Sequence, residues 1–152
     1  MIFILSGNIE TGKTTTLLKW TNGRNDVFGI LTPRNENDIR YILDINTKEH
    51  FEMQADLETP NVIVVGRYRF LKSAFEKGND IIKNATQNNR SGYIIIDELG
   101  KLELKSKGLY PSASVAIRET IHNSELHLIL IIRTELLLKT INKFKITDYQ
   151  FW

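Results

Sequence analysis

The chain has no cysteine among its 152 residues and only three prolines. The absence of cysteine excludes disulfide bonds, thiolate metal sites and cysteine nucleophiles, and it fits a reducing compartment. Neither sign of charge is in large excess, because a formal net charge of +2 is too small to indicate a nucleic-acid or membrane partner. The remaining composition, 41% hydrophobic and 25% charged, is typical of a soluble globular protein.

Long hydrophobic runs are also lacking. The first hydrophobic run, Met1–Leu5, has no basic segment before it and is shorter than the core of a secretory signal. The longest later run, Leu128–Ile132, is far below the roughly 20 residues that a membrane span needs. We therefore expect a cytoplasmic protein without a membrane segment.

Apolar runs alternate with amphipathic segments along the chain. Short apolar runs predict strands at Ile2–Leu5, Val27–Leu31, Tyr93–Ile96 and Leu126–Ile132, with a weak final strand over Phe144–Trp152. Helices are predicted at Thr14–Thr21, Ser73–Asn88, Ser112–His122 and Thr134–Ile141. Strands that alternate with helices and consist of solid apolar runs predict an α/β fold with a mostly parallel central sheet.

The segment from about residue 36 to residue 66 follows a different pattern. Apolar and polar residues alternate from Ile39 to Leu43, a turn is expected at Asn46–Lys48, and another strand over Asn61–Val65 follows Pro60. This pattern predicts a small antiparallel hairpin insert. With no repeat, low-complexity tract or flexible linker, we expect residues 1–152 to form a single domain.

A phosphate-binding loop directly follows the first predicted strand. Gly7-Asn8-Ile9-Glu10-Thr11-Gly12-Lys13-Thr14 matches G-x-x-x-x-G-K-[ST] at every fixed position. Glycine lets backbone N–H groups turn toward phosphate oxygens, and the following helix directs its free amides toward the same anion. We expect the loop residues, together with Thr15, to bind the phosphates of a nucleoside triphosphate. Lys13 would contact the β- and γ-phosphates, and the Thr14 hydroxyl would bind Mg²⁺.

Two carboxylates end the predicted strand before residue 97. Because ligands bind beyond the carboxyl ends of strands in open α/β sheets, we expect Asp97 to lie beside Thr14 and to hold Mg²⁺, through water. Glu98 would then polarise a water in line with the γ-phosphate as general base. The alternative for Glu98 is a surface salt bridge.

Arg133 follows the strand at Leu128–Ile132. If that strand lies between the first strand and the Asp97 strand, Arg133 faces the γ-phosphate and offsets charge during phosphoryl transfer. Otherwise it is a solvated strand end.

The sequence has other basic and aromatic residues outside these motifs. Arg34 and Arg40 either contact phosphates or cover the insert. We expect the lysines at positions 101, 105 and 107 to lie in a solvated loop, the three histidines to be structural or surface residues, and Trp20 and the C-terminal aromatic residues to pack.

These motifs together resemble the THEP1-like nucleoside-triphosphatases. The resemblance rests on Gly7–Thr16, Phe28–Thr32, the string from Ile96 to Leu104 and the strand end at Arg133. It implies a RecA-like, three-layer P-loop fold and hydrolysis of several nucleoside triphosphates, ATP or GTP, to the diphosphate and phosphate. By position it implies a catalytic set of Lys13, Thr14, Asp97 and Glu98, and a supporting role for Glu103. The chain departs from the family pattern in Pro33–Asn37 and in the interior of the phosphate loop.

Two other functions share the phosphate loop. A nucleoside, nucleotide or small-molecule kinase needs an acceptor site and usually an arginine-rich lid, and no compact lid of that kind is visible. A GTPase switch reads guanine with [NT]-K-x-D, and the two nearest strings, at residues 47–50 and 142–145, both lack the aspartate. We therefore expect broad base preference and no clear nucleic-acid partner.

Overall fold

Seven strands form the central sheet of the computed structural model, which describes residues 1–8 and 11–152. Five of them run parallel, in the order β2-β7-β8-β1-β9. These are β1 (Ile2–Gly7), β2 (Val27–Leu31), β7 (Gly92–Ile96), β8 (Leu126–Arg133) and β9 (Gln150–Phe151). The apolar runs predicted from the sequence supply the four long strands. β8 lies between β1 and β7, which is the order in which Arg133 is expected to face the γ-phosphate.

Antiparallel strands extend one edge of this sheet. β3 (Tyr41–Asp44) pairs with β2, and β4 (His50–Glu52) pairs with β3. A separate antiparallel hairpin follows, made of β5 (Ile63–Val65) and β6 (Tyr68–Phe70). The sequence predicted antiparallel structure here but ended it near residue 66. The structure corrects that boundary, because β6 runs to Phe70 and the first hairpin belongs to the main sheet.

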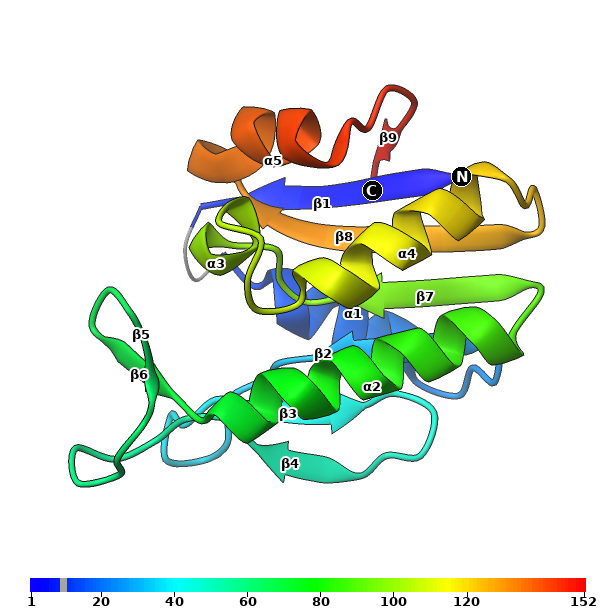
Figure 1. The fold of residues 1–152 in the computed structure, drawn as a ribbon. Coiled ribbons are helices and arrows are strands. Elements are labelled where there is room, and N and C mark those ends of the chain that lie inside the picture. Colours follow the sequence, from blue (N-terminus) through cyan, green and yellow to red (C-terminus); the bar gives the residue numbers. More distant parts are fainter. Residues whose placement is uncertain (9–10) are drawn as a thin grey trace.

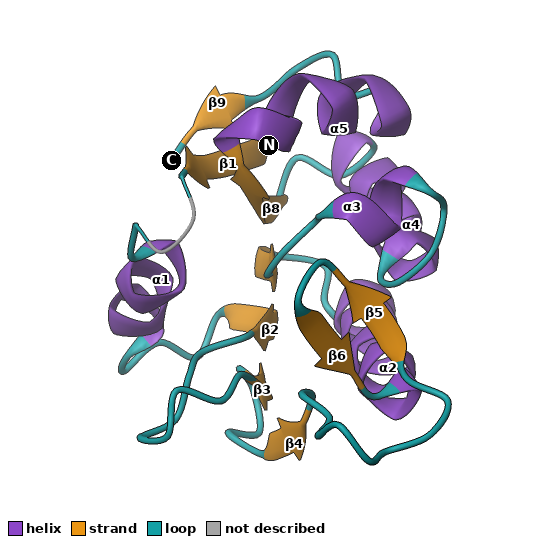
Figure 2. Cartoon of the chain, turned by 90° about the vertical axis from the view of Figure 1, so that its left-hand side faces the viewer, coloured by secondary structure: helices purple, strands orange, loops and turns teal. Residues whose placement is uncertain are grey.

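Helices cover both faces of the sheet (Figure 1). The helices are α1 (Lys13–Thr21), α2 (Lys72–Asn88), α3 (Lys101–Leu104), α4 (Tyr110–Ile121) and α5 (Leu137–Phe144), with a 3₁₀ turn at Thr134–Leu136. Figure 2 looks at the edge where the parallel strands end, with α1 on one side of the sheet and α2, α4 and the β5–β6 hairpin on the other. The result is the three-layer α/β architecture that the sequence predicted.

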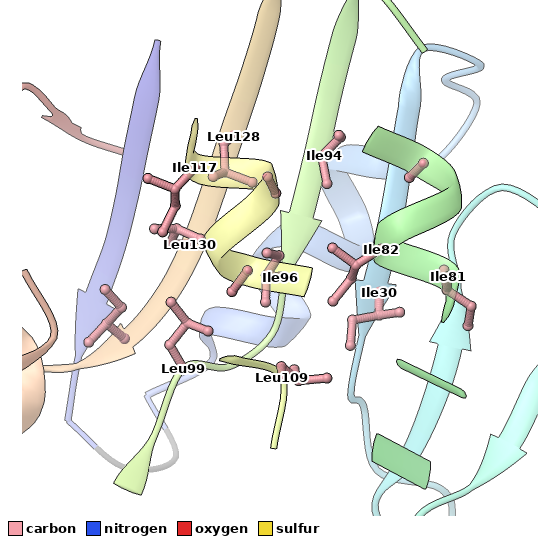
Figure 3. Packing of buried hydrophobic residues seen from close by; sticks show 14 of the residues in the cluster. Ile30, Ile81, Ile82, Ile94, Ile96, Leu99, Leu109, Ile117, Leu128 and Leu130 are labelled. Carbon is pink, nitrogen blue, oxygen red and sulfur yellow. The ribbon is translucent and has the colours of Figure 1, made fainter. Parts of the chain in front are cut away.

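Buried aliphatic side chains fill the space between the sheet and helices α2 and α4. Figure 3 shows Ile94, Ile96 and Leu128 on the strands facing Ile82 and Ile117 on these helices. All five are at most 4% exposed. Strands whose side chains are buried on both faces read as continuous apolar runs, which explains why these strands could be predicted.

A glycine allows close contact between two central strands. Gly29 in β2 has φ +95, and a β-carbon there would collide with the carbonyl oxygen of Ile95 in β7. Only glycine adopts this conformation at little cost. Gly29 therefore lets β2 pair with β7 and brings the end of β2 beside the end of β7.

Several boundaries differ from the prediction. Lys101, which was expected with Lys105 and Lys107 in a solvated loop, instead begins α3, and the last strand shortens to Gln150–Phe151. The predicted helix at Thr134–Ile141 begins as a 3₁₀ turn and continues as α5 to Phe144. Within the described part of the chain, no helix is long and apolar enough to cross a membrane.

Candidate active site

The carboxyl ends of β1, β2, β7 and β8 meet at one edge of the sheet, the edge that faces the viewer in Figure 2. The phosphate loop leaves β1 at this edge and α1 begins directly after it. In open α/β sheets this is the edge at which ligands bind. From the sequence we expect the candidate residues at this edge, because they directly follow predicted strands.

Gly12 and Lys13 shape the end of the phosphate loop. Gly12 precedes α1 in the left-handed conformation, with φ 81, which favours glycine. Lys13 Nζ donates to the carbonyl oxygens of Gly7, at 3.1 Å, and Asn8, at 2.6 Å. The ammonium group therefore lies along the loop, where it can contact phosphate oxygens. Among the other predicted binding residues, Ile9 and Glu10 lie outside the described residues.

Asp97 connects three elements of the site. Its Oδ2 accepts hydrogen bonds from the Thr14 hydroxyl, at 2.7 Å, and from the backbone amide of Thr32, at 2.9 Å. The side chain follows β7, while Thr14 is in α1 and Thr32 follows β2. Asp97 is only 2% exposed. The expected juxtaposition of Asp97 and Thr14 is therefore present, and the Thr32 amide joins it.

The Thr14 hydroxyl and the Asp97 carboxylate suit a magnesium ion. Both are hard oxygen donors, and their hydrogen bond places them within reach of one ion. Across residues 1–8 and 11–152, no three histidine, cysteine, aspartate or glutamate side chains gather as a metal-binding group. This donor set fits Mg²⁺, which retains water and phosphate ligands and needs few protein ligands.

Glu98 and Arg133 form an ion pair at the ends of β7 and β8. Arg133 Nη2 lies 3.1 Å from Glu98 Oε1, and both side chains are about four-fifths buried. Burial raises the pKa of Glu98, and the neighbouring Asp97 charge raises it further. Arg133, Arg40 and Lys13 lower the same pKa. Arg133 is therefore not a solvated strand end, and the salt bridge of Glu98 is mostly buried.

Glu98 and Arg133 line a pocket of about 460 Å³ together with residues of the phosphate loop. Its size lies within the range of roughly 300–1,000 Å³ that small-molecule sites occupy. Its lining comes from the phosphate loop and α1, from the segment after β2, and from the ends of β7 and β8. It includes Thr11, Gly12, Lys13, Thr14, Thr15, Thr32, Arg34, Arg40, Glu98 and Arg133.

The two arginines after β2 have different surroundings. Arg40 lines the pocket and lowers the pKa of Glu98, so it faces the site. Arg34 also lines the pocket, and it donates to the Tyr68 hydroxyl at 3.3 Å and to the carbonyl oxygen of Asp38 at 3.2 Å. Tyr68 is in β6, which the sequence did not predict. Arg34 thus links the pocket to the β5–β6 hairpin.

Glu103 supports the segment that follows Glu98. Its two carboxylate oxygens accept the backbone amides of Gly100, at 2.8 Å, and Leu109, at 2.9 Å, and the residue is 3% exposed. Burial raises the pKa of Glu103. Because these bonds join the start of α3 to the residue before α4, Glu103 holds the backbone beyond Glu98 in place.

Thr32, for which the sequence predicted no role beyond the end of the Phe28–Thr32 match, also contributes to the site. Its amide binds Asp97, and its hydroxyl, on a residue that is 3% exposed, has no hydrogen-bond partner among the described residues. The available signal was its position directly after β2, at the same edge of the sheet as Glu98 and Arg133. The three histidines do not line this pocket.

The chain matches one protein family and is similar to two solved structures. A family model described as NTPase matches residues 2–150. No curated protein sequence matches the chain. The crystal structure of THEP1 from the hyperthermophile Aquifex aeolicus is similar, with a TM-score of 0.72 and 21% identity over 99% of this chain and 88% of that one. The solution structure of a human cancer-related nucleoside triphosphatase has a TM-score of 0.63 and 23% identity over 99% of this chain and 86% of that one. At these identities the two structures show a common P-loop fold.

Proposed function

This chain belongs to the NTPase family, and from that premise we propose that it hydrolyses nucleoside triphosphates to the diphosphate and phosphate with Mg²⁺. One observation carries the proposal. Glu98 lines the same pocket as Lys13 and Thr14 and directly follows Asp97, so a base, a phosphate-binding cation and two oxygen donors for the metal converge.

Binding of the triphosphate is assigned to the phosphate loop. Lys13 exchanges the carbonyl oxygens that it now contacts for β- and γ-phosphate oxygens, and the amides at the start of α1 donate to the same anion. Thr14 and Asp97 hold Mg²⁺, which offsets the phosphate charge when bound. Gly7, Asn8, Ile9, Glu10, Thr11, Gly12 and Thr15 complete the proposed nucleotide contacts.

Hydrolysis is assigned to Glu98 and Arg133. The Glu98 carboxylate accepts a proton from a water molecule that attacks the γ-phosphorus atom. Burial raises the pKa of Glu98, which makes it a stronger base than an exposed glutamate, while the neighbouring Arg133 charge lowers the same pKa and favours the ionised form. During transfer, the Arg133 guanidinium offsets negative charge on the γ-phosphoryl oxygens.

Broad base preference is part of the proposal, because neither [NT]-K-x-D-like string in the sequence carries the aspartate that reads guanine. The cytoplasmic location and the single-domain organisation remain predictions.

The test of hydrolysis is a ³¹P NMR assay of the full chain with Mg²⁺ and ATP or GTP, and no added acceptor. We expect inorganic phosphate and the diphosphate with both nucleotides. Phosphate that appears only when an acceptor is added would contradict hydrolysis as the function.

A further inference from the structure

A second cavity, of about 70 Å³, borders the pocket of the phosphate loop. The two spaces share one polar wall, which consists of Thr32, Arg40, Glu98 and Arg133. Beyond that wall most of the lining is apolar and includes Ile42, Met53, Val65, Phe70, Phe75 and Leu109, while Tyr68, Asp97, Lys101 and Glu103 also border it. The proposed general base therefore faces a nucleotide pocket and an apolar cavity at once.

Hydrolysis of a triphosphate requires a bound nucleotide and a water molecule, and neither of them needs an apolar cavity. A bound water needs two to four polar partners, and a side of the cavity lined by Met53, Val65 and Phe75 supplies none from these side chains. Unfilled apolar volume also destabilises a protein, because the lining atoms lose contacts. These walls suit the aliphatic part of a small organic molecule instead.

The polar wall has an unused hydrogen-bonding group. Thr32 is 3% exposed, and its hydroxyl has no partner among the described residues. The same holds for Ser6, Thr120 and Thr140, but of these four residues only Thr32 lines the two spaces. Buried hydroxyl groups nearly always have a hydrogen-bond partner in native proteins. A ligand hydroxyl at this wall would satisfy Thr32 and would lie beside Glu98, the group that can remove its proton.

We propose that the cavity binds a small aliphatic alcohol and that the chain transfers the γ-phosphoryl group of the triphosphate to the alcohol hydroxyl. The inference rests on the proposed nucleotide site, and it adds an acceptor other than water. The alcohol oxygen forms a bond to the γ-phosphorus atom while the bond from that atom to the β–γ bridging oxygen breaks. The alcohol proton passes to Glu98, and the nucleoside diphosphate leaves.

The size of the cavity selects the class of alcohol. A cavity of about 150 Å³ holds a benzene ring, so a space near half that volume takes an unbranched chain of about two or three carbon atoms. Ethanol and propan-1-ol are suitable probes, since each joins a short apolar chain to one primary hydroxyl.

The test is ³¹P NMR of the full chain with Mg²⁺, ATP and either alcohol. We expect an alkyl phosphate beside inorganic phosphate, and we expect its formation to saturate with alcohol concentration. Because a bound acceptor has a high effective concentration, the ratio of alkyl phosphate to phosphate should exceed the molar ratio of alcohol to water by at least about tenfold.

A pair of variants on β5 links this activity to the cavity. Val65→Trp fills the cavity from the hairpin and should lower the ratio of alkyl phosphate to phosphate by at least about tenfold. Val64→Trp is the matched control, because Val64 is 59% exposed and neighbouring strand residues point to opposite faces. The control should retain the ratio and the rate of phosphate release. If Val65→Trp does not fold by circular dichroism, Val65→Phe takes its place.

Three outcomes overturn the inference. Phosphate release with no alkyl phosphate at any alcohol concentration leaves the hydrolase and removes the alcohol site. An equal product ratio in Val65→Trp and the unmodified chain shows that the alcohol reacts outside this cavity. If neither phosphate nor alkyl phosphate forms, the proposed hydrolysis fails together with the transfer.

Discussion

The Thr14 hydroxyl donates a 2.7 Å hydrogen bond to Asp97, a residue 83 positions further along the chain. Thr14 lies in the first turn of α1, and Asp97 follows β7. The bond closes the metal-binding side of the site, because it brings a hydroxyl and a carboxylate oxygen together where the triphosphate is proposed to bind.

Asp97→Asn should raise the Mg²⁺ concentration needed for half-maximal activity by about 10- to 100-fold, the usual cost of losing a group that binds a metal ion through water. The amide oxygen can still accept from Thr14 and Thr32, so the fold should survive. The measurement is a magnesium titration of phosphate release. Asp80→Asn, on an exposed residue of α2, is the control. Equal magnesium dependence in both variants would remove Asp97 from the metal site.

Lys13→Ala should abolish tight binding of the triphosphate. The ammonium group is the charged donor in the loop, and each hydrogen bond to a charged group contributes about 1.5–3 kcal/mol, so we expect about two orders of magnitude in affinity. Isothermal titration calorimetry with a non-hydrolysable nucleotide measures the loss. Lys19→Ala, on the exposed side of the same helix, should bind normally. A Lys13→Ala protein of unchanged affinity would contradict the assignment of the loop.

Glu98→Gln should retain nucleotide binding and magnesium dependence yet lose activity by about 10²- to 10⁴-fold, the usual contribution of a general base. Glutamine has a similar shape but takes up no proton from water. Steady-state phosphate release and nucleotide titration separate the two properties. Glu125→Gln, at an exposed position before β8, is the matched substitution that should have no effect. Unchanged turnover in Glu98→Gln would show that another group is the base.

Arg133→Gln should move the acidic side of the pH–activity profile to higher pH. Burial and Asp97 raise the pKa of Glu98, and Arg133 lowers it, so removal of the guanidinium raises the pKa further. Because the base acts only when ionised, activity then requires a higher pH.

The profile of phosphate release against pH gives the result, and the maximum rate should fall as well. Arg118→Gln, whose side chain is 64% exposed, is the control. A lower maximum rate with an unmoved acidic side would mean that Arg133 acts on the phosphate alone and leaves Glu98 unaffected.

Glu103→Gln should be destabilising, and most so at acidic pH. Only one side-chain atom of glutamine can accept a hydrogen bond, so one of the amides of Gly100 and Leu109 loses its partner, at a cost of about 1–3 kcal/mol. Burial raises the folded-state pKa of Glu103, so its contribution is full below the unfolded pKa and declines as the pH rises through the folded pKa.

The difference in free energy of unfolding between the two proteins should therefore narrow from acidic to neutral pH. Urea unfolding at a series of pH values measures it, and Glu76→Gln on the exposed side of α2 supplies the reference. A difference that widens toward neutral pH would contradict the sign of the pKa shift.

Local patterns were enough to predict much of the site. The apolar run of Ile2–Leu5 and the glycines of the loop indicated a strand, a phosphate loop and a helix in that order. The run before Asp97 indicated a strand end with a carboxylate. These features can be predicted from the sequence because a buried parallel strand needs a continuous apolar run and a phosphate loop needs glycine at fixed positions.

Contacts between neighbouring segments, and the shortness of the elements themselves, explain the remaining differences. Lys101–Leu104 is only four residues long, and its helix is held by the contact of Glu103 with Leu109, which no local pattern reveals. Tyr68 lies in a three-residue strand that forms by pairing with β5. Strands this short have too few residues for an alternating pattern to stand out.

Residue types at fixed local spacing were enough to predict the α/β class, the phosphate-loop motif and the carboxylates at the end of β7. The tertiary structure alone decided that Thr14 binds Asp97, that Arg133 pairs with Glu98, and that Thr32 joins them between a nucleotide pocket and an apolar cavity. These relationships depend on the order of the strands in the sheet, and strand order is set by packing between segments that lie far apart in the chain.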